Sequence, residues 1–263
     1  MTYFGFLLRF LVFPILALLL LTFIDERRFP PMQHFQNGKV VWKIIALHGI
    51  IAVIYTTPWD NYLVANGVWF YNPALVSGIL LGYVPLEEYL FFVLETLLAG
   101  LWWWFLARRL PEPSNFRPSR RGRWIAFGVL LGAWALSAYL LFAGGQRWTY
   151  LSIILFWALP AMFPQFLIGA DILWHYRRLV GLGILVPGAY LSAMDIVALS
   201  ASTWSISPQH TTGLLLFGIL PVEEVLFFFI TNVLIIFGMT LMLSNLCRER
   251  FFAWRRRNFR GLP

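Results

Sequence analysis

Long apolar segments separated by short polar connections make up most of this chain. A helix of about 20 apolar residues crosses the ~30 Å hydrocarbon core of a bilayer. Seven segments meet that length, namely residues 4–24, 40–58, 86–107, 124–143, 150–173, 181–200 and 221–243. Because a segment in lipid must satisfy its own backbone polar groups, we expect all seven to be helices. The pattern predicts an all-α integral membrane protein with about seven transmembrane helices.

Composition and charge placement support this prediction. Of the 263 residues, 60% are hydrophobic and only 12% are charged, whereas soluble domains carry about a quarter charged residues. A soluble enzyme, a disordered chain and a disulfide-stapled secreted fold are therefore excluded, and the one cysteine, Cys247, has no partner in the chain. The net charge is +8, yet 18 of the 20 Lys and Arg residues lie in the first, third and fifth connections and in the C-terminal tail. The positive-inside rule then places the N-terminus outside and the C-terminus in the cytoplasm, with a bacterial cytoplasmic membrane as the expected setting. Topology and anionic lipid account for these charges, so no nucleic-acid partner is expected.

Two stretches of the chain, 58–96 and 193–232, repeat the same spaced residues. In both copies an Asp precedes a Trp by nine residues, and a Pro follows the Trp by four. The copies end in Pro85-Leu86-Glu87-Glu88 and Pro221-Val222-Glu223-Glu224, and a Phe-Phe pair follows each of them. One extra residue separates the two glycines of the second copy. So many matched spacings indicate an internal duplication.

The duplication suggests how the spans are organised. Tyr3, Pro14 and Asp25 match Tyr150, Pro160 and Asp171 more weakly, which extends each copy to three spans. We therefore expect a first repeat over 1–110, a linker with the fourth span over 111–149, a second repeat over 150–247 and a basic cytoplasmic tail over 248–263. Three spans, an odd number, lie between the first and the fifth, so the two repeats cross the membrane in the same direction. Such parallel repeats place sites at their shared interface.

Carboxylates gather at the non-cytoplasmic ends of these spans. Glu87, Glu88, Glu223 and Glu224 fall in the first turns of two helices, where capping alone would favour acids. Three more acids are candidates of second rank. Asp60 and Asp195 end the second and sixth spans, and Glu95 lies two helical turns beyond Glu88. Charge repulsion and burial with few nearby cations favour protonated carboxylic acids, which can donate protons.

Aromatic residues surround these acids. The candidates to line a substrate or cation site are Trp69, Phe91, Phe92, Trp204, Phe227 and Phe228. Rings are common at membrane interfaces, but as a set they also offer π-faces to a cation. A proton donor in an apolar, ring-lined pocket suits protonation of a carbon–carbon double bond. The four histidines show no metal-ligand spacing and no nucleotide motif is present, so no metal and no cofactor are expected.

The duplicated motif resembles the PxE(E/D)xxFF signature of the integral-membrane lycopene cyclases of carotenoid biosynthesis. In that family the two halves occur either as small subunits or fused, and here both halves lie in one chain. The resemblance implies a cyclase that converts the ψ end groups of lycopene to rings, expected to be β, without net redox chemistry. It implies that the motif carboxylates are essential, and we expect Glu87 and Glu223 to be the principal acid and base, tuned by Glu88 and Glu224.

Further expectations and alternatives follow from these assignments. Lycopene and the lipid bilayer are the expected partners, and association with other carotenoid enzymes is possible. Since all the motif acids share one side and lycopene is about as long as the bilayer is thick, we expect one shared site that forms one ring at a time. A proton-coupled transporter would use the same acids but spread them across the membrane. A structural membrane protein would tolerate their replacement by amides.

Overall fold

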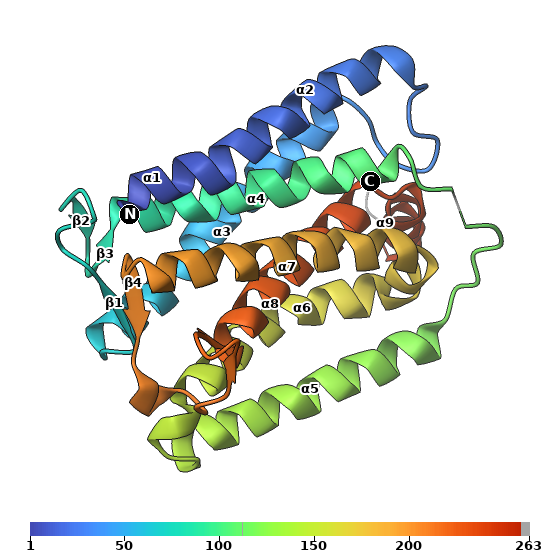
Figure 1. The fold of residues 1–263 in the computed structure, drawn as a ribbon. Helices are drawn as coiled ribbons and strands as arrows, with labels where there is room; N and C mark the ends of the chain where they lie inside the picture. Colours follow the sequence, from blue (N-terminus) through green and yellow to red (C-terminus); the bar gives the residue numbers. More distant parts are fainter. Residues whose placement is uncertain (112, 259–263) are drawn as a thin grey trace.

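The computed structural model describes residues 1–111 and 113–258, and within them seven helices are long and apolar enough to cross a membrane (Figure 1). The prediction of an all-α membrane protein with seven spans is confirmed. The spans are Tyr3–Arg28, Lys39–Ala65, Leu86–Ala107, Arg120–Ala143, Gln146–His175, Arg177–Ser200 and Val222–Leu243.

The first and fifth spans are each built from more than one element. The first consists of α1 (Tyr3–Leu7), the π-helical turn η1 (Leu8–Val12) and α2 (Phe13–Arg28). Pro14 lies in the first turn of α2, and its missing N–H accounts for the widened turn before it. The fifth consists of the short 3₁₀ turn η2 (Gln146–Trp148) and α6 (Thr149–His175).

The other spans are single helices, and short elements connect them. The single helices are α3 (Lys39–Ala65), α4 (Leu86–Ala107), α5 (Arg120–Ala143), α7 (Arg177–Ser200) and α8 (Val222–Leu243). The short elements are β1 (Trp69–Tyr71), β2 (Leu80–Leu81), β3 (Val84–Pro85), β4 (Trp204–Ile206), η3 (Pro208–His210), β5 (Leu215–Leu216) and β6 (Leu220–Pro221). A last helix, α9 (Asn245–Asn258), occupies most of the basic tail, whose residues 259–263 lie outside the described part of the chain.

Helix α3 departs most from the sequence-based boundaries. It continues seven residues beyond the predicted end at residue 58, so Asp60 lies inside the helix and does not end it. Pro58 lies inside α3 without ending it. Two side-chain hydrogen bonds flank it: the Thr57 hydroxyl donates to the Val53 carbonyl (2.5 Å), and the Asn61 amide donates to the Thr57 carbonyl (2.9 Å). Membrane helices tolerate proline more often than soluble ones.

The two motif-bearing helices form the centre of the bundle. In the most apolar 18-residue stretch of each helix, 61% of α4 and 56% of α8 is buried, whereas only 11% of α5 is buried. Helix α5 packs along α6 at the edge of the bundle, as Figure 1 shows. That position suits the linker role expected of the fourth span, although the repeat boundaries themselves remain a prediction.

Each motif helix is preceded by a small β-hairpin that explains the repeated glycines. Strands β2 and β3 pair through Leu80 and Pro85, and β5 and β6 pair through Leu215 and Pro221. The extra residue of the second copy lies in the hairpin loop, which is three residues long (217–219) where the first is two (82–83). Gly82 in the first loop and its counterpart in the second have φ of 72° and 70°, a conformation that glycine adopts without strain.

Strands from the two halves also pair with each other. Strand β1 follows α3, strand β4 follows α7, and they pair antiparallel with Tyr71 opposite Trp204. The pair lies at the end of the bundle that carries the N-terminus and both hairpins, whereas α9 lies at the opposite end (Figure 1). The halves are thereby joined directly beside the motif acids.

Candidate active site

Acids from the two halves of the chain line one small cavity at this end of the bundle. Glu88 from α4 and Glu224 from α8 both line it, together with Asp195 from α7. Its volume is about 30 Å³. The remaining lining residues are aromatic, namely Tyr3, Trp69, Tyr71, Phe91, Trp204, Phe227 and Phe228. We call this space the acid cavity.

Each glutamate of the acid cavity receives a hydrogen bond from a tyrosine of its own half. The Tyr3 hydroxyl donates to Glu88 Oε2 at 2.5 Å, and the Tyr150 hydroxyl donates to Glu224 Oε1 at 2.5 Å. Both tyrosines and both glutamates are buried. Sequence reasoning had used Tyr3 and Tyr150 only as weak repeat markers and missed their contact with the acids. The two contacts are alike in donor, acceptor and distance.

The indole groups of the two repeated tryptophans break this symmetry. Trp204 donates to Asp195 Oδ1 at 2.8 Å within its own half, whereas Trp69 donates to Glu224 Oε1 at 3.3 Å across the halves. Asp60, the counterpart of Asp195, is completely buried, and its oxygens accept no hydrogen bond from the described residues. It does not line the acid cavity. The two halves therefore offer unequal surroundings to their acids.

The first glutamate of each motif has a different role in the structure. Glu87 accepts hydrogen bonds from the backbone N–H (2.5 Å) and the hydroxyl (3.0 Å) of Ser77. Glu223 accepts one from the backbone N–H of Thr212 at 2.6 Å. Both are fully buried against the loops that precede their helices and neither lines the acid cavity. Glu87 and Glu223, which we expect to be the principal acid and base, thus lie outside the acid cavity that Glu88 and Glu224 line.

Two other predicted site residues lie deeper in the bundle. Glu95 accepts hydrogen bonds from Thr231 (2.7 Å) and Asn232 (3.3 Å) of α8. It lines a second, apolar cavity together with Phe92. The other five predicted aromatic residues do line the acid cavity. The structure thus brings together Glu88, Glu224 and Asp195 but leaves Glu95 about two helical turns away along α4.

The acid cavity is poor in positive charge and rich in ring faces. None of the described residues that line it is Lys or Arg. Burial raises the pKa of Tyr71 well above its ordinary value, and the carboxylates of Asp60 and Glu88 raise it further. Tyr71 therefore stays a neutral phenol beside the acids. The surroundings disfavour ionised carboxylates and suit a transient carbocation, which ring faces stabilise.

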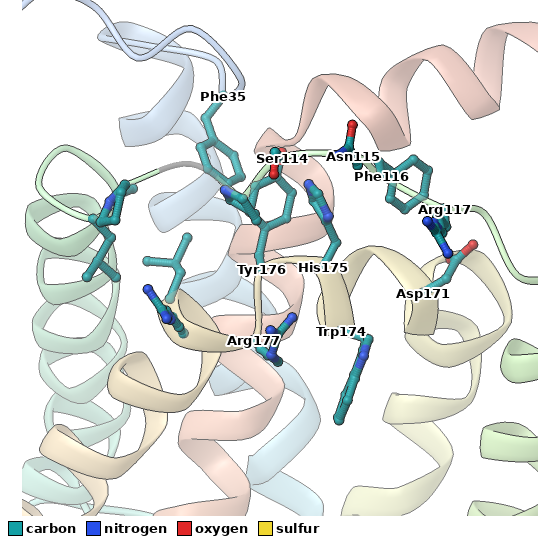
Figure 2. Close-up of a pocket in the computed structure, with 16 residues that line it drawn as sticks. Phe35, Ser114, Asn115, Phe116, Arg117, Asp171, Trp174, His175, Tyr176 and Arg177 are labelled. Carbon is teal, nitrogen blue, oxygen red and sulfur yellow. The ribbon is translucent and has the colours of Figure 1, made fainter.

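We call the end of the bundle opposite the acid cavity, where the basic helix α9 lies (Figure 1), the basic end. It contains a cavity of a different kind, with a volume of about 580 Å³. Figure 2 shows the loop residues Ser114, Asn115 and Phe116 beside His175 and Tyr176. Asp171 lines this cavity and forms an ion pair with Arg250 at 2.8 Å. None of the motif glutamates reaches it, so we do not consider it the site of the acid chemistry.

Asp25 and Asp171, one from each half of the chain, form ion pairs at this end of the bundle. Asp25, which the repeat matched with Asp171, pairs with Arg109 through bonds of 2.5 and 2.8 Å. The weak repeat markers Asp25 and Asp171 are thus each bound by an arginine from a later element. These two acids are held at the basic end, and they do not continue a path from the acid cavity.

Comparison with known proteins gives clear relatives. The chain is 41% identical over 206 residues to a lycopene beta-cyclase of Halobacterium salinarum, covering 76% of this chain and 82% of that protein. It is 33% identical over 230 residues to a bifunctional lycopene cyclase/phytoene synthase of Podospora anserina, covering 84% of this chain and 37% of the fungal protein. The corresponding protein of Gibberella fujikuroi is 31% identical over 237 residues.

No family model matches the chain, and no solved structure matches it significantly. The relatives give no support to the proton-coupled transporter alternative. The identity with the archaeal protein extends over most of both chains, and the duplicated acidic motif had already indicated the same family. The chain therefore belongs to the lycopene cyclase family.

Proposed function

We propose that this protein cyclises the linear ψ end groups of lycopene to β rings in a cavity shared by its two halves. The observation that carries the proposal is the meeting of Glu88 and Glu224, each bonded to a buried tyrosine, in one ring-lined cavity. The relatives from Halobacterium salinarum and Podospora anserina carry lycopene cyclase in their names, which supports lycopene cyclisation as the reaction. The β ring follows the name of the archaeal relative.

The reaction needs one proton delivered and one removed. A protonated glutamate adds a proton to the terminal double bond, and a carbocation forms at the neighbouring carbon. The electron pair of the next double bond along the chain closes the ring, which moves the positive charge onto a ring carbon. A carboxylate then removes a proton from a carbon next to the positively charged ring carbon, and a double bond forms between these two carbons. Substrate and product have the same composition, so the reaction consumes no oxidant or reductant.

We assign the acid and base roles to Glu88 and Glu224, with Asp195 beside them as the third carboxyl group. The Tyr3 and Tyr150 hydroxyls would orient the two glutamates. Glu87 and Glu223 would act as positioning residues, because they fix the loops from which the motif helices start. The rings of Phe91, Phe227 and Phe228 would face the cation and exclude water.

We further propose a bacterial cytoplasmic membrane setting, with the acid cavity near the outer surface and α9 on the cytoplasmic side. The charge pattern of the connections supports this orientation. Reporter fusions after residue 111 and after residue 145 test it, because the first should report the cytoplasm and the second the exterior. The reverse result would invert the topology.

Expression in a bacterium that accumulates lycopene tests the function. The pigments should shift from lycopene to ring-bearing carotenes with unchanged mass, and chromatography distinguishes β from ε rings. A membrane-inserted protein that leaves lycopene unchanged would refute the proposal. Copurification tests the association with other carotenoid enzymes.

A further inference from the structure

An apolar groove runs along the bundle between α3, α6 and α8. Its volume is about 360 Å³. The residues that line it include His48, Ile51, Ala52, Tyr55, Trp157, Ala161, Ile168, Phe227, Gly238, Leu241, Met242 and Cys247. It is the second, apolar cavity that Glu95 and the motif residues Phe92 and Phe227 also line. The relatives' names assign no role to it.

The groove opens sideways toward the lipid. Ile51 of α3 is 50% exposed, Ile168 of α6 is 48% exposed and Met242 of α8 is 41% exposed. All three sit in transmembrane helices, where the exposed surface faces hydrocarbon. A ligand that enters here must therefore come from the membrane and must itself be apolar.

The outer end of the groove meets the acid cavity at a wall of stacked rings. Phe227 lines both spaces. Its ring stacks on Trp59 with centroids 5.4 Å apart, and Trp59 stacks on Trp157 at 4.8 Å. Tyr55 stacks on Trp157 at 5.5 Å and completes the wall on the lipid side. We call these four residues the ring wall.

The groove and the acid cavity together extend over nearly the length of a long polyene. Phe227 and Met242 are 15 residues apart on α8, or about 22 Å at 1.5 Å per residue. Starting from Glu224 in the acid cavity, the same path is about 27 Å. A 40-carbon linear carotenoid is about as long as the ~30 Å hydrocarbon core. A polyene with one end at Glu224 would therefore bring its other end close to Cys247, at the inner end of the groove.

The acid cavity alone cannot hold the reacting end. Its volume is about 30 Å³, whereas a cavity that binds benzene has about 150 Å³. An end group that closes a six-membered ring therefore needs additional space. Phe227 of the ring wall lines both the cavity and the groove, so that space can open beside its ring.

We propose that the groove binds the polyene chain of the carotenoid, with one end group passing the ring wall into the acid cavity and the other lying near Cys247. This inference rests on the proposed function and specifies where its substrate lies. Because the groove leads to one acid cavity, the protein holds one end of the polyene in that cavity at a time.

The only cysteine of the chain makes occupancy measurable. Cys247 lines the groove and is partly buried. The test uses the full-length protein in lipid nanodiscs and follows labelling of Cys247 by a maleimide, with and without lycopene. The double variant Glu88→Gln/Glu224→Gln removes turnover, so that binding is measured apart from chemistry. At a lycopene concentration ten times the dissociation constant, labelling should slow about tenfold.

Matched variants locate the effect. Ala161→Trp places a large ring in the groove and should abolish the protection of Cys247 by lycopene. Ala133→Trp adds the same ring to an exposed position on α5 and should leave the protection unchanged. If Ala161→Trp does not insert, Ala52→Phe fills the groove from α3.

The outcomes separate this inference from the proposed function. Equal labelling with and without lycopene in the double variant would overturn the groove, as would full protection in the inserted Ala161→Trp protein. Slow labelling without lycopene, unchanged when lycopene is added, would identify a bilayer acyl chain as the occupant and also overturn it. Protection together with full cyclisation by the double variant would refute the acid assignment and leave the groove in place.

Discussion

Replacing each glutamate of the first motif by glutamine separates chemistry from loop positioning. In Glu88→Gln the amide carbonyl can still accept the hydrogen bond from Tyr3, so the local structure should persist. The variant cannot give up or take up the proton. General acid or base catalysis contributes about 10²- to 10⁴-fold in rate. At about 1.4 kcal/mol per factor of ten, this is about 3–6 kcal/mol of barrier.

The neighbouring variant should behave differently. In Glu87→Gln the amide carbonyl still accepts from the Ser77 backbone N–H, but the amide NH₂ no longer accepts from the Ser77 hydroxyl. The hydrogen bond between the Ser77 hydroxyl and the buried side chain at position 87 is thereby lost, which costs about 1–3 kcal/mol of stability. We expect a lower melting temperature and a loss of cyclisation rate smaller than tenfold.

Initial rates of ring formation from lycopene, measured by chromatography on membranes with equal amounts of inserted protein, compare the two variants. Glu88→Gln should lose at least about a hundredfold, and Glu87→Gln should retain most activity. The pair Glu224→Gln and Glu223→Gln repeats the comparison in the second half. If the Glu87 variant is inactive while correctly folded and the Glu88 variant is active, the assignment of roles from the acid cavity is wrong.

Three further predictions follow from the contacts. Tyr150→Phe removes a hydrogen bond to a charged or polar partner, Glu224, and should slow cyclisation by roughly tenfold or more, given about 1.5–3 kcal/mol for such a bond; unchanged rates would exclude an orienting role. Asp171→Asn weakens the ion pair with Arg250 and should lower the melting temperature but not the activity per folded protein, whereas a loss of activity alone would contradict the separation of the two ends. Early in the reaction a one-ring carotene should precede the two-ring product, and simultaneous appearance of both rings would contradict a single acid cavity.

The maleimide labelling itself has a predicted pH dependence. Burial raises the pKa of the Cys247 thiol above its ordinary value of 9.0, and only the thiolate reacts. The thiol is therefore neutral near pH 7, and the labelling rate should still be increasing at pH 9. A plateau below pH 8 would contradict the burial of this group.

The sequence predicted the spans well because lipid imposes simple rules. Uninterrupted apolar length fixed the number of helices, and the acidic motif located the starts of α4 and α8 to within one residue. The repeat spacing also identified Glu88 and Glu224 as members of one group. These features depend on local composition, which a single sequence displays directly.

The roles inside the motif depend on tertiary contacts that no local pattern encodes. Two adjacent glutamates on a helix point in different directions, and only the structure shows that Glu87 meets a loop while Glu88 meets Tyr3. Helix α3 ends seven residues beyond the predicted position, because it continues past the apolar stretch through the polar residues Asp60 and Asn61. The β1–β4 pairing joins residues 69–71 with 204–206, a separation that periodicity cannot reveal.

The central claim is that a carboxyl group in the acid cavity transfers a solvent-exchangeable proton to the polyene. Cyclisation in heavy water, followed by mass spectrometry of the purified carotenes, measures this transfer directly. The account predicts one deuterium retained for every ring formed, because the proton added and the proton lost occupy different carbons. Ring formation without incorporation of deuterium would contradict it.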